Sequence, residues 1–289
     1  MRRRSQIVSE SVLHLLIISH HEAGSSGVWV LMVCRFSKRL VLLDDRADDF
    51  LKTLVLLGGY CTVEQAGGLG IARSPTRVLA HLRGLERAGF LRKLPGYPVV
   101  YQVARAATRL LETDRMARRP HPVETVRTRL LGVSFYLEAL RWPARFVLDH
   151  AQKVAAFREA ACPVSMLPQR SGKPYLWGEF ILKRGDRRLA AVLVDSNHRS
   201  AFLQLWRLGR RFVPCLEQLG DGLQLLIAVG SEARYRLYSR LIGHPSLQKL
   251  SHGKFEVSIG LYRVRKPVRF LQSATRPDSG LPDKYRTRR

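Results

Sequence analysis

Two helices joined by a short turn are predicted by residues 62–91, TVEQAGGLGIARSPTRVLAHLRGLERAGFL. The four residues TVEQ at 62–65 have the pattern of a capping box, which satisfies backbone donors at the start of a helix. Ser74-Pro75 has the pattern of a second helix start, with serine as the N-cap and proline at the first helical position. The apolar residues that follow recur at helical spacing and stop before Gly89. The stretch therefore predicts a short helix, a turn and a longer helix.

The residues on either side of this pair complete a larger pattern. Residues 50–57 place apolar side chains at helical spacing and end at Gly58-Gly59, which predicts a preceding helix. Residues 90–93 and 99–103 predict two strands, with a turn at Pro95-Gly96 between them. Three helices followed by a two-stranded hairpin have the order of a winged helix-turn-helix. Such a unit presents its third helix to the major groove of duplex DNA, so the pattern predicts a DNA-binding domain.

Nine residues of this domain are candidates for contact with duplex DNA. On the third helix, Thr76, Arg77 and His81 are expected to face away from the apolar side and to reach base edges. Basic side chains beside them and at the base of the hairpin suit phosphates, and one tyrosine lies near the hairpin tip. The candidate DNA-binding residues are Arg73, Thr76, Arg77, His81, Arg83, Arg87, Arg92, Lys93 and Tyr97. A solvated face on an ordinary helical hairpin and a winged helix that contacts protein are the two alternatives.

The chain carries a large positive charge that favours a polyanionic partner. It has 49 Lys and Arg against 23 Asp and Glu among its 289 residues, a formal net charge of +26. Residues 73–119 hold eleven basic and three acidic residues, so the charge is concentrated around the third helix. A genome that favours arginine codons would raise the total but would not produce this clustering. The composition therefore predicts salt-sensitive association with nucleic acid.

Other classes of protein have little support in the sequence. No apolar run reaches the length of a membrane-spanning helix, so no membrane partner is predicted. The cysteines are scattered without metal-ligand spacing and predict thiols in a reducing, cytoplasmic location; they are Cys34, Cys61, Cys162 and Cys215. No phosphate-binding glycine loop, HExxH or paired CxxC motif occurs, so the sequence predicts neither a metal nor a cofactor for a DNA-binding protein.

The chain is expected to divide into five segments. Residues 1–40 are predicted to be a disordered leader, or to include a start placed too early, with Met32 as the internal start. Residues 41–115 hold the winged helix, and residues 116–145 hold a connector whose helix docks the two domains or forms a homodimer. Residues 146–264 form an α/β domain. Residues 265–289 form a basic flexible tail, which follows a DNA backbone or serves solubility alone.

The α/β domain has helices and strands in an order typical of one nuclease fold. In chain order these are a helix over 151–161, strands over 175–183 and 188–195, a helix over 200–218, a strand over 223–229, a helix ending at 242 and an edge strand over 255–264. Helix, strands, helix, strand is the order of the restriction-endonuclease-like core. The predicted fold class is therefore α+β, an N-terminal winged helix-turn-helix followed by an α/β restriction-endonuclease-like domain.

Four segments carry a resemblance to a known protein family. They are residues 39–65, 82–91, 192–195 (VLVD) and 202–212. Through them, residues 40–245 resemble the replication-relaxation family of plasmid and conjugative-element proteins. The resemblance implies a winged helix ahead of a nuclease-like domain, and a role in mobilisation, transfer or replication control. A relaxase or another transfer protein is the partner expected with such a role.

The residues that would supply nuclease chemistry are mostly missing. Such a core needs two or three acids at adjoining strand ends to hold Mg²⁺, and a lysine to activate water. Trp177 and Leu193 stand where acids are expected, and no lysine follows Asp195. Glu179 and Asp195 are the remaining catalytic candidates. Mg²⁺ would be a cofactor only if the nuclease alternative holds.

Asp195 has two other expected roles, and they bear on function. Its carboxylate would cap the helix that begins near Ser200, or pair with an arginine such as Arg199 or Arg207.

The leading prediction is therefore a non-enzymatic, sequence-preferring duplex-DNA-binding protein that acts in plasmid or integrative-element mobilisation, transfer or replication control. The alternatives are a Mg²⁺-dependent DNA nuclease and a transcriptional repressor with a sensing C-terminal domain.

Overall fold

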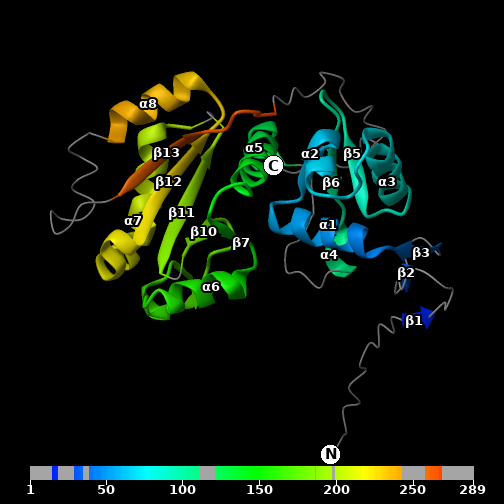
Figure 1. Cartoon of the computed structure of the whole chain (residues 1–289), viewed down its shortest axis with the longest axis horizontal. Coiled ribbons are helices and arrows are strands. Elements are labelled where there is room, and N and C mark those ends of the chain that lie inside the picture. The colour runs from blue at the N-terminus through cyan, green and yellow to red at the C-terminus, as the bar shows by residue number, and fades with distance from the viewer. Residues whose placement is uncertain are drawn as a thin grey trace, which may run out of the picture.

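A computed structural model of the chain describes residues 15–18, 29–34, 39–110, 121–185, 187–196, 199–242 and 258–268. The described chain is mixed α/β. It has an N-terminal unit over residues 45–110 and a C-terminal unit over residues 145–264, and helix α5 (Val123–Ala139) lies between them (Figure 1).

The N-terminal unit is three helices and a small antiparallel sheet, followed by one more short helix. Its elements in chain order are α1 (Asp45–Leu56), β4 (Tyr60–Thr62), α2 (Val63–Gly68), α3 (Pro75–Arg87), β5 (Leu91–Leu94), β6 (Val100–Val103) and α4 (Arg105–Leu110). The sheet has the order β4-β6-β5, so β6 lies in its centre. The three helices and the β5–β6 hairpin were predicted from the sequence, whereas β4 was not.

Local hydrogen bonds explain where these helices begin. The Thr62 hydroxyl accepts from the Gln65 amide at 3.2 Å, and the Gln65 side chain accepts from the Thr62 amide at 3.1 Å. This reciprocal pair confirms the predicted capping box. The Ser74 hydroxyl accepts from the Arg77 amide at 3.4 Å, with Pro75 at the first position of α3. Both predicted helix starts are therefore confirmed.

The C-terminal unit is built on a five-stranded mixed sheet. Its main elements are β7 (Arg145–Val147), α6 (His150–Glu159), β10 (Phe180–Arg184), β11 (Arg188–Asp195), α7 (Ala201–Leu219), β12 (Leu223–Val229), α8 (Glu232–Ile242) and β13 (Ile259–Arg263). A small hairpin, β8 (Gln169–Arg170) with β9 (Lys173–Pro174), precedes β10. The sheet order is β13-β12-β11-β10-β7. β7, β10 and β11 are antiparallel neighbours, and β12 and β13 continue parallel to β11.

Side chains alternate along β11 and give the sheet two covered faces. Leu189 and Ala191 are buried in a cluster with residues of α6 and α7. Ala190 and Val192 are buried in a second cluster that includes Phe135 of α5. The sheet is therefore covered by α6 and α7 on one face and by α5 on the other, which explains why β11 and β12 are almost wholly apolar (Figure 1).

Helix α5 packs on both units. Val126 and Leu130 are buried against Tyr60 of the N-terminal unit. The Gln65 side-chain amide also donates to the Leu130 carbonyl at 2.8 Å and to the Ser134 hydroxyl at 2.9 Å. One of the two roles predicted for this helix, docking of the domains, is therefore confirmed. Dimer formation stays a prediction.

The strand predicted over 175–183 begins only at Phe180. The carbonyls of Leu176 and Glu179 accept hydrogen bonds from the Lys153 ammonium at 3.1 and 2.8 Å. The carbonyl of Tyr175 accepts a hydrogen bond from a guanidinium of α7 at 3.3 Å. Because side chains already donate hydrogen bonds to these backbone carbonyls, residues 175–179 do not pair with the neighbouring strands of the sheet.

The structure describes three short strands that begin within the expected leader, whose assignment as disordered or as an early start stays a prediction. Here β1 (Leu15–Ile18), β2 (Trp29–Cys34) and β3 (Arg39–Leu43) form an antiparallel sheet in that order. Continuous apolar runs such as LLII and WVLMVC favour paired strands even without an alternating pattern.

Several sequence predictions lie outside the described residues. They are the rest of the leader, residues 116–120 of the connector and the tail beyond residue 268. Among the helices that the structure describes, none is long and apolar enough to cross a membrane.

Candidate nucleic-acid interface

Helix α3 has one buried face and one exposed basic face. Val78, Leu82 and Leu85 are buried in the core of the N-terminal unit. The residues predicted to contact DNA that are exposed on or beside α3 are Arg73, Thr76, Arg77, Arg83 and Arg87. Successive residues of a helix are rotated by about 100°, so Thr76, Arg83 and Arg87 fall nearly opposite the buried stripe. The helix therefore presents a row of basic side chains to solvent.

His81 is less accessible than the sequence pattern implied. Its side chain is half-buried, whereas Arg83 and Arg87, which were expected only to flank the reading face, are exposed. The reason is angular, because His81 lies three residues after Val78 and four before Leu85, on the edge of the buried stripe. The outward face of α3 is therefore more basic than predicted.

The β5–β6 hairpin carries the three other predicted contacts. Lys93 is exposed, and Tyr97 near the hairpin tip is 76% exposed. Arg92 is half-buried, and its Nε donates to the Gln102 side-chain oxygen at 2.8 Å. Alternation along β5 places Arg92 on the same face as Leu94, which packs toward α5. Lys93 and Tyr97 are thus exposed on the hairpin, while Arg92 faces the helix between the units.

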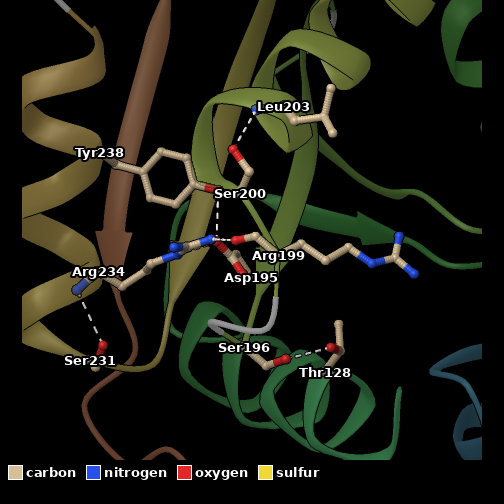
Figure 2. Close-up of polar contacts among 9 residues, drawn as sticks. All are labelled: Thr128, Asp195, Ser196, Arg199, Ser200, Leu203, Ser231, Arg234 and Tyr238. Atoms are coloured by element: carbon tan, nitrogen blue, oxygen red, sulfur yellow. Dashed lines mark hydrogen bonds and ion pairs between the residues drawn. The ribbon is translucent and has the colours of Figure 1, made fainter. Parts of the chain in front are cut away.

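Asp195 lies at the end of β11 and is almost completely buried, with 1% exposure. Its Oδ2 accepts from Arg234 Nε at 2.6 Å and from the Tyr238 hydroxyl at 2.7 Å, both on α8 (Figure 2). Burial and the neighbouring Asp195 charge raise the pKa of the Tyr238 hydroxyl, which therefore stays protonated as a donor. The carboxylate joins β11 to α8.

The predicted partners of Asp195 are therefore wrong in detail. The sequence pointed to an arginine, and an arginine is present, but it is Arg234 in place of Arg199 or Arg207. The predicted capping of α7 is performed by Ser200, whose hydroxyl accepts from the Leu203 amide at 3.4 Å. Arg199 takes part through its backbone, because its carbonyl accepts from Arg234 (Figure 2).

Glu179, the other catalytic candidate, is held in a different ion pair. It precedes β10, is 8% exposed, and accepts a hydrogen bond from Arg211 of α7. Burial raises the pKa of the Glu179 carboxyl, while the charges of Arg211 and Lys153 oppose the rise. Among the described residues, no group of three or more His, Cys, Asp and Glu side chains has the arrangement of a metal site. Each of the two carboxylates is thus paired with an arginine of a different helix, Glu179 with α7 and Asp195 with α8.

The raised pKa of Glu179 predicts how stability depends on pH. Because the folded state binds this proton more tightly than the unfolded state, the stabilisation is complete below the ordinary value of 4.5 and is lost as the pH rises through the folded pKa. Glu179→Gln removes the titration. Urea unfolding across this range is expected to show the variant gaining stability relative to the wild type as the pH rises. Parallel curves for the two proteins would show that Glu179 titrates normally.

A cleft of about 900 Å³ lies between the two units and was not predicted. Its charged lining residues are Arg129, Arg170, Arg199, Arg207, Arg211 and Glu179. Arg129 of α5 donates to the Gly58 carbonyl at 2.7 Å and lies over the Tyr60 ring, 5.4 Å from its centre. The arginines come from α5, the small β8–β9 hairpin, the loop after β11 and α7, so no local sequence pattern joins them.

Similarity of this chain to known proteins is low. No family model matches the chain, and no curated protein matches it. One solved structure, that of TrmBL2, an archaeal chromatin protein described as showing a novel mode of DNA binding, has low similarity to it. The identity is 14%, the match covers 76% of this chain and 72% of that chain, and the TM-score is 0.19. That TM-score is too low to show a shared fold.

Proposed function

We propose that the N-terminal unit is a winged helix-turn-helix that binds duplex DNA through α3. The observation that carries the proposal is the exposed basic face of α3, opposite a fully formed apolar face. The order of α1, β4, α2 and α3, followed by the β5–β6 hairpin, is that of winged helices. A helix of this kind fits the major groove, where guanidinium groups reach phosphates and guanine edges.

The hairpin supports the same assignment. Lys93 at the base and Tyr97 near the tip of the proposed wing are both exposed, and the wing follows α3 in the chain. A lysine and a tyrosine hydroxyl both donate to phosphate oxygens, which orient a protein on DNA without reading its sequence. In the proposed complex α3 reads bases and the wing contacts the backbone.

We propose further that the C-terminal unit is a restriction-endonuclease-like domain without catalysis. The support is the order α5, β7, β10, β11, α7, β12, with three antiparallel strands and a fourth that is parallel to the third. Asp195 and Glu179 are both engaged by arginines, which favours a structural role over the Mg²⁺-dependent nuclease alternative.

The resemblance to the replication-relaxation family supports a role in mobilisation, transfer or replication control. A neighbouring relaxase or coupling-protein gene would strengthen that role.

The double substitution Arg77→Ala/Arg83→Ala tests the DNA-binding face. Both side chains are exposed, so folding is expected to be unaffected while affinity for a duplex falls at least about tenfold. If both arginines contact phosphates, the slope of log affinity against log salt is expected to fall by about 1.8. Fluorescence anisotropy with a labelled duplex at several salt concentrations measures both quantities.

A matched control separates this site from general charge. Arg210→Ala/Arg240→Ala removes two exposed arginines from α7 and α8, outside the proposed interface. It is expected to change duplex affinity less than about twofold. Equal losses in the two double variants would reject α3 as the DNA-binding helix.

A further inference from the structure

We propose that the cleft between the two units binds single-stranded nucleic acid, as a second site separate from α3. The cleft has a volume of about 900 Å³ and is lined by residues of both units and of α5. Five arginines and one glutamate line it, a net of +4. An uncompensated positive charge between two walls concentrates polyanions.

The cleft includes arginines that have no ion-pair partner in the part of the chain that the structure describes. Arg199 and Arg207 are exposed, and neither side chain forms an ion pair among the described residues. Arg211, in contrast, pairs with Glu179. Phosphate groups would therefore meet guanidinium groups that the fold does not use.

Four of the cleft arginines come from α5, from α7 and from the segment between β11 and α7. On α7, Arg207 and Arg211 are four residues apart and so lie on one side of the helix. Arg199 lies between β11 and α7, and its carbonyl accepts a hydrogen bond from the buried Arg234 (Figure 2). Arg129 stands on α5 and is held there by the Gly58 carbonyl. Hydrogen bonds thus hold the Arg129 side chain and the Arg199 backbone in place.

The size and lining of the cleft favour a single strand over a duplex. Its volume is in the range of pockets for small ligands, about 300 to 1,000 Å³, which admits a few nucleotides but no segment of double helix. Tyr175 and Trp177 line the cleft and are half-buried, and Trp177 is held parallel to the His150 ring, 4.8 Å between centres. Partly exposed aromatic rings among cations are the usual means of binding single strands, by base stacking beside phosphate contacts.

The test measures binding of labelled oligothymidylate, about 12 nucleotides long, to the full chain. Arg199→Ala/Arg207→Ala is expected to weaken this binding at least about tenfold and to lower the slope of log affinity against log salt by about 1.4. It leaves the Arg199 carbonyl and the Arg234 contact in place. Trp177→Ala is expected to weaken binding about tenfold without a change in slope, because stacking releases no counterions.

Three comparisons make the result decisive. The control Arg210→Ala/Arg240→Ala is expected to bind oligothymidylate nearly as the wild type does, and an equal loss in this control overturns the proposal. Competition by inorganic phosphate or ATP at concentrations near that of the oligonucleotide also overturns it, in favour of a small-anion pocket. Duplex binding is expected to be unchanged in Arg199→Ala/Arg207→Ala and weakened in Arg77→Ala/Arg83→Ala. A result against the cleft proposal is therefore distinguishable from a result against the α3 proposal.

Discussion

Asp195→Ala is expected to lower the free energy of unfolding by about 3 to 5 kcal/mol, the usual cost of breaking a buried ion pair from one side. The substitution leaves the Arg234 guanidinium, which is 7% exposed, in the interior without its carboxylate. It also removes the acceptor of the Tyr238 hydroxyl. Urea unfolding of the wild type and the variant, followed by circular dichroism, measures the difference.

Two further variants show whether the cost comes from the buried charge. Tyr238→Phe removes one neutral donor to Asp195 and is expected to cost about 1 kcal/mol. Glu159→Ala removes an acid that pairs with Lys183 but is 56% exposed, and it is expected to cost less than about 1 kcal/mol. If Asp195→Ala costs no more than Glu159→Ala, Asp195 does not hold α8 against β11.

The same residue separates the proposed function from its enzymatic rival. A Mg²⁺-dependent nuclease that uses Asp195 would have to free the carboxylate from both Arg234 and Tyr238. We expect no cleavage or nicking of plasmid DNA by the wild-type protein with Mg²⁺. Cleavage by the wild type that disappears in a folded Asp195→Asn variant would establish the nuclease instead.

Features of the sequence that act over a few residues predicted individual helices and strands well. The helix starts at Thr62 and Ser74 depend on hydrogen bonds between residues three apart, so the chain need not be folded for them to be recognised. Strand β12 was predicted with its observed bounds because seven consecutive residues, LQLLIAV, are nearly all apolar. Such signals fix the kind and order of elements without placing them against one another.

The contacts that define the candidate sites join residues that are far apart along the chain, so no local sequence pattern predicts them. Asp195 and Arg234 are 39 residues apart, and they meet only because α8 returns to the end of β11. Arg129 and Arg211 line one cleft although they belong to different helices, α5 and α7. The sequence showed that arginines are abundant, but which of them remain unpaired is a property of the packed structure.

Phe135→Ala is expected to lower the free energy of unfolding by about 3 to 5 kcal/mol, because it leaves a cavity in the core between α5 and the sheet. Phe135 is fully buried and makes edge contacts with Trp142 and Phe146, each 5.6 Å between ring centres. Its ring also lies 5.7 Å from that of Tyr262 on β13. The substitution thus loosens α5 from the sheet of the C-terminal unit, and urea unfolding again measures the loss.

The position of α5 gives this variant a second consequence. Val126 and Leu130 bind the same helix to the N-terminal unit, so weakening its other face is expected to reduce the cooperativity between the units. Fluorescence and circular dichroism would then report different midpoints in Phe135→Ala and one midpoint in the wild type. Leu140→Ala, at the exposed end of α5 with 54% exposure, is the control and is expected to cost less than about 0.5 kcal/mol. A single, slightly shifted transition in Phe135→Ala would mean that the units are held together by contacts outside α5.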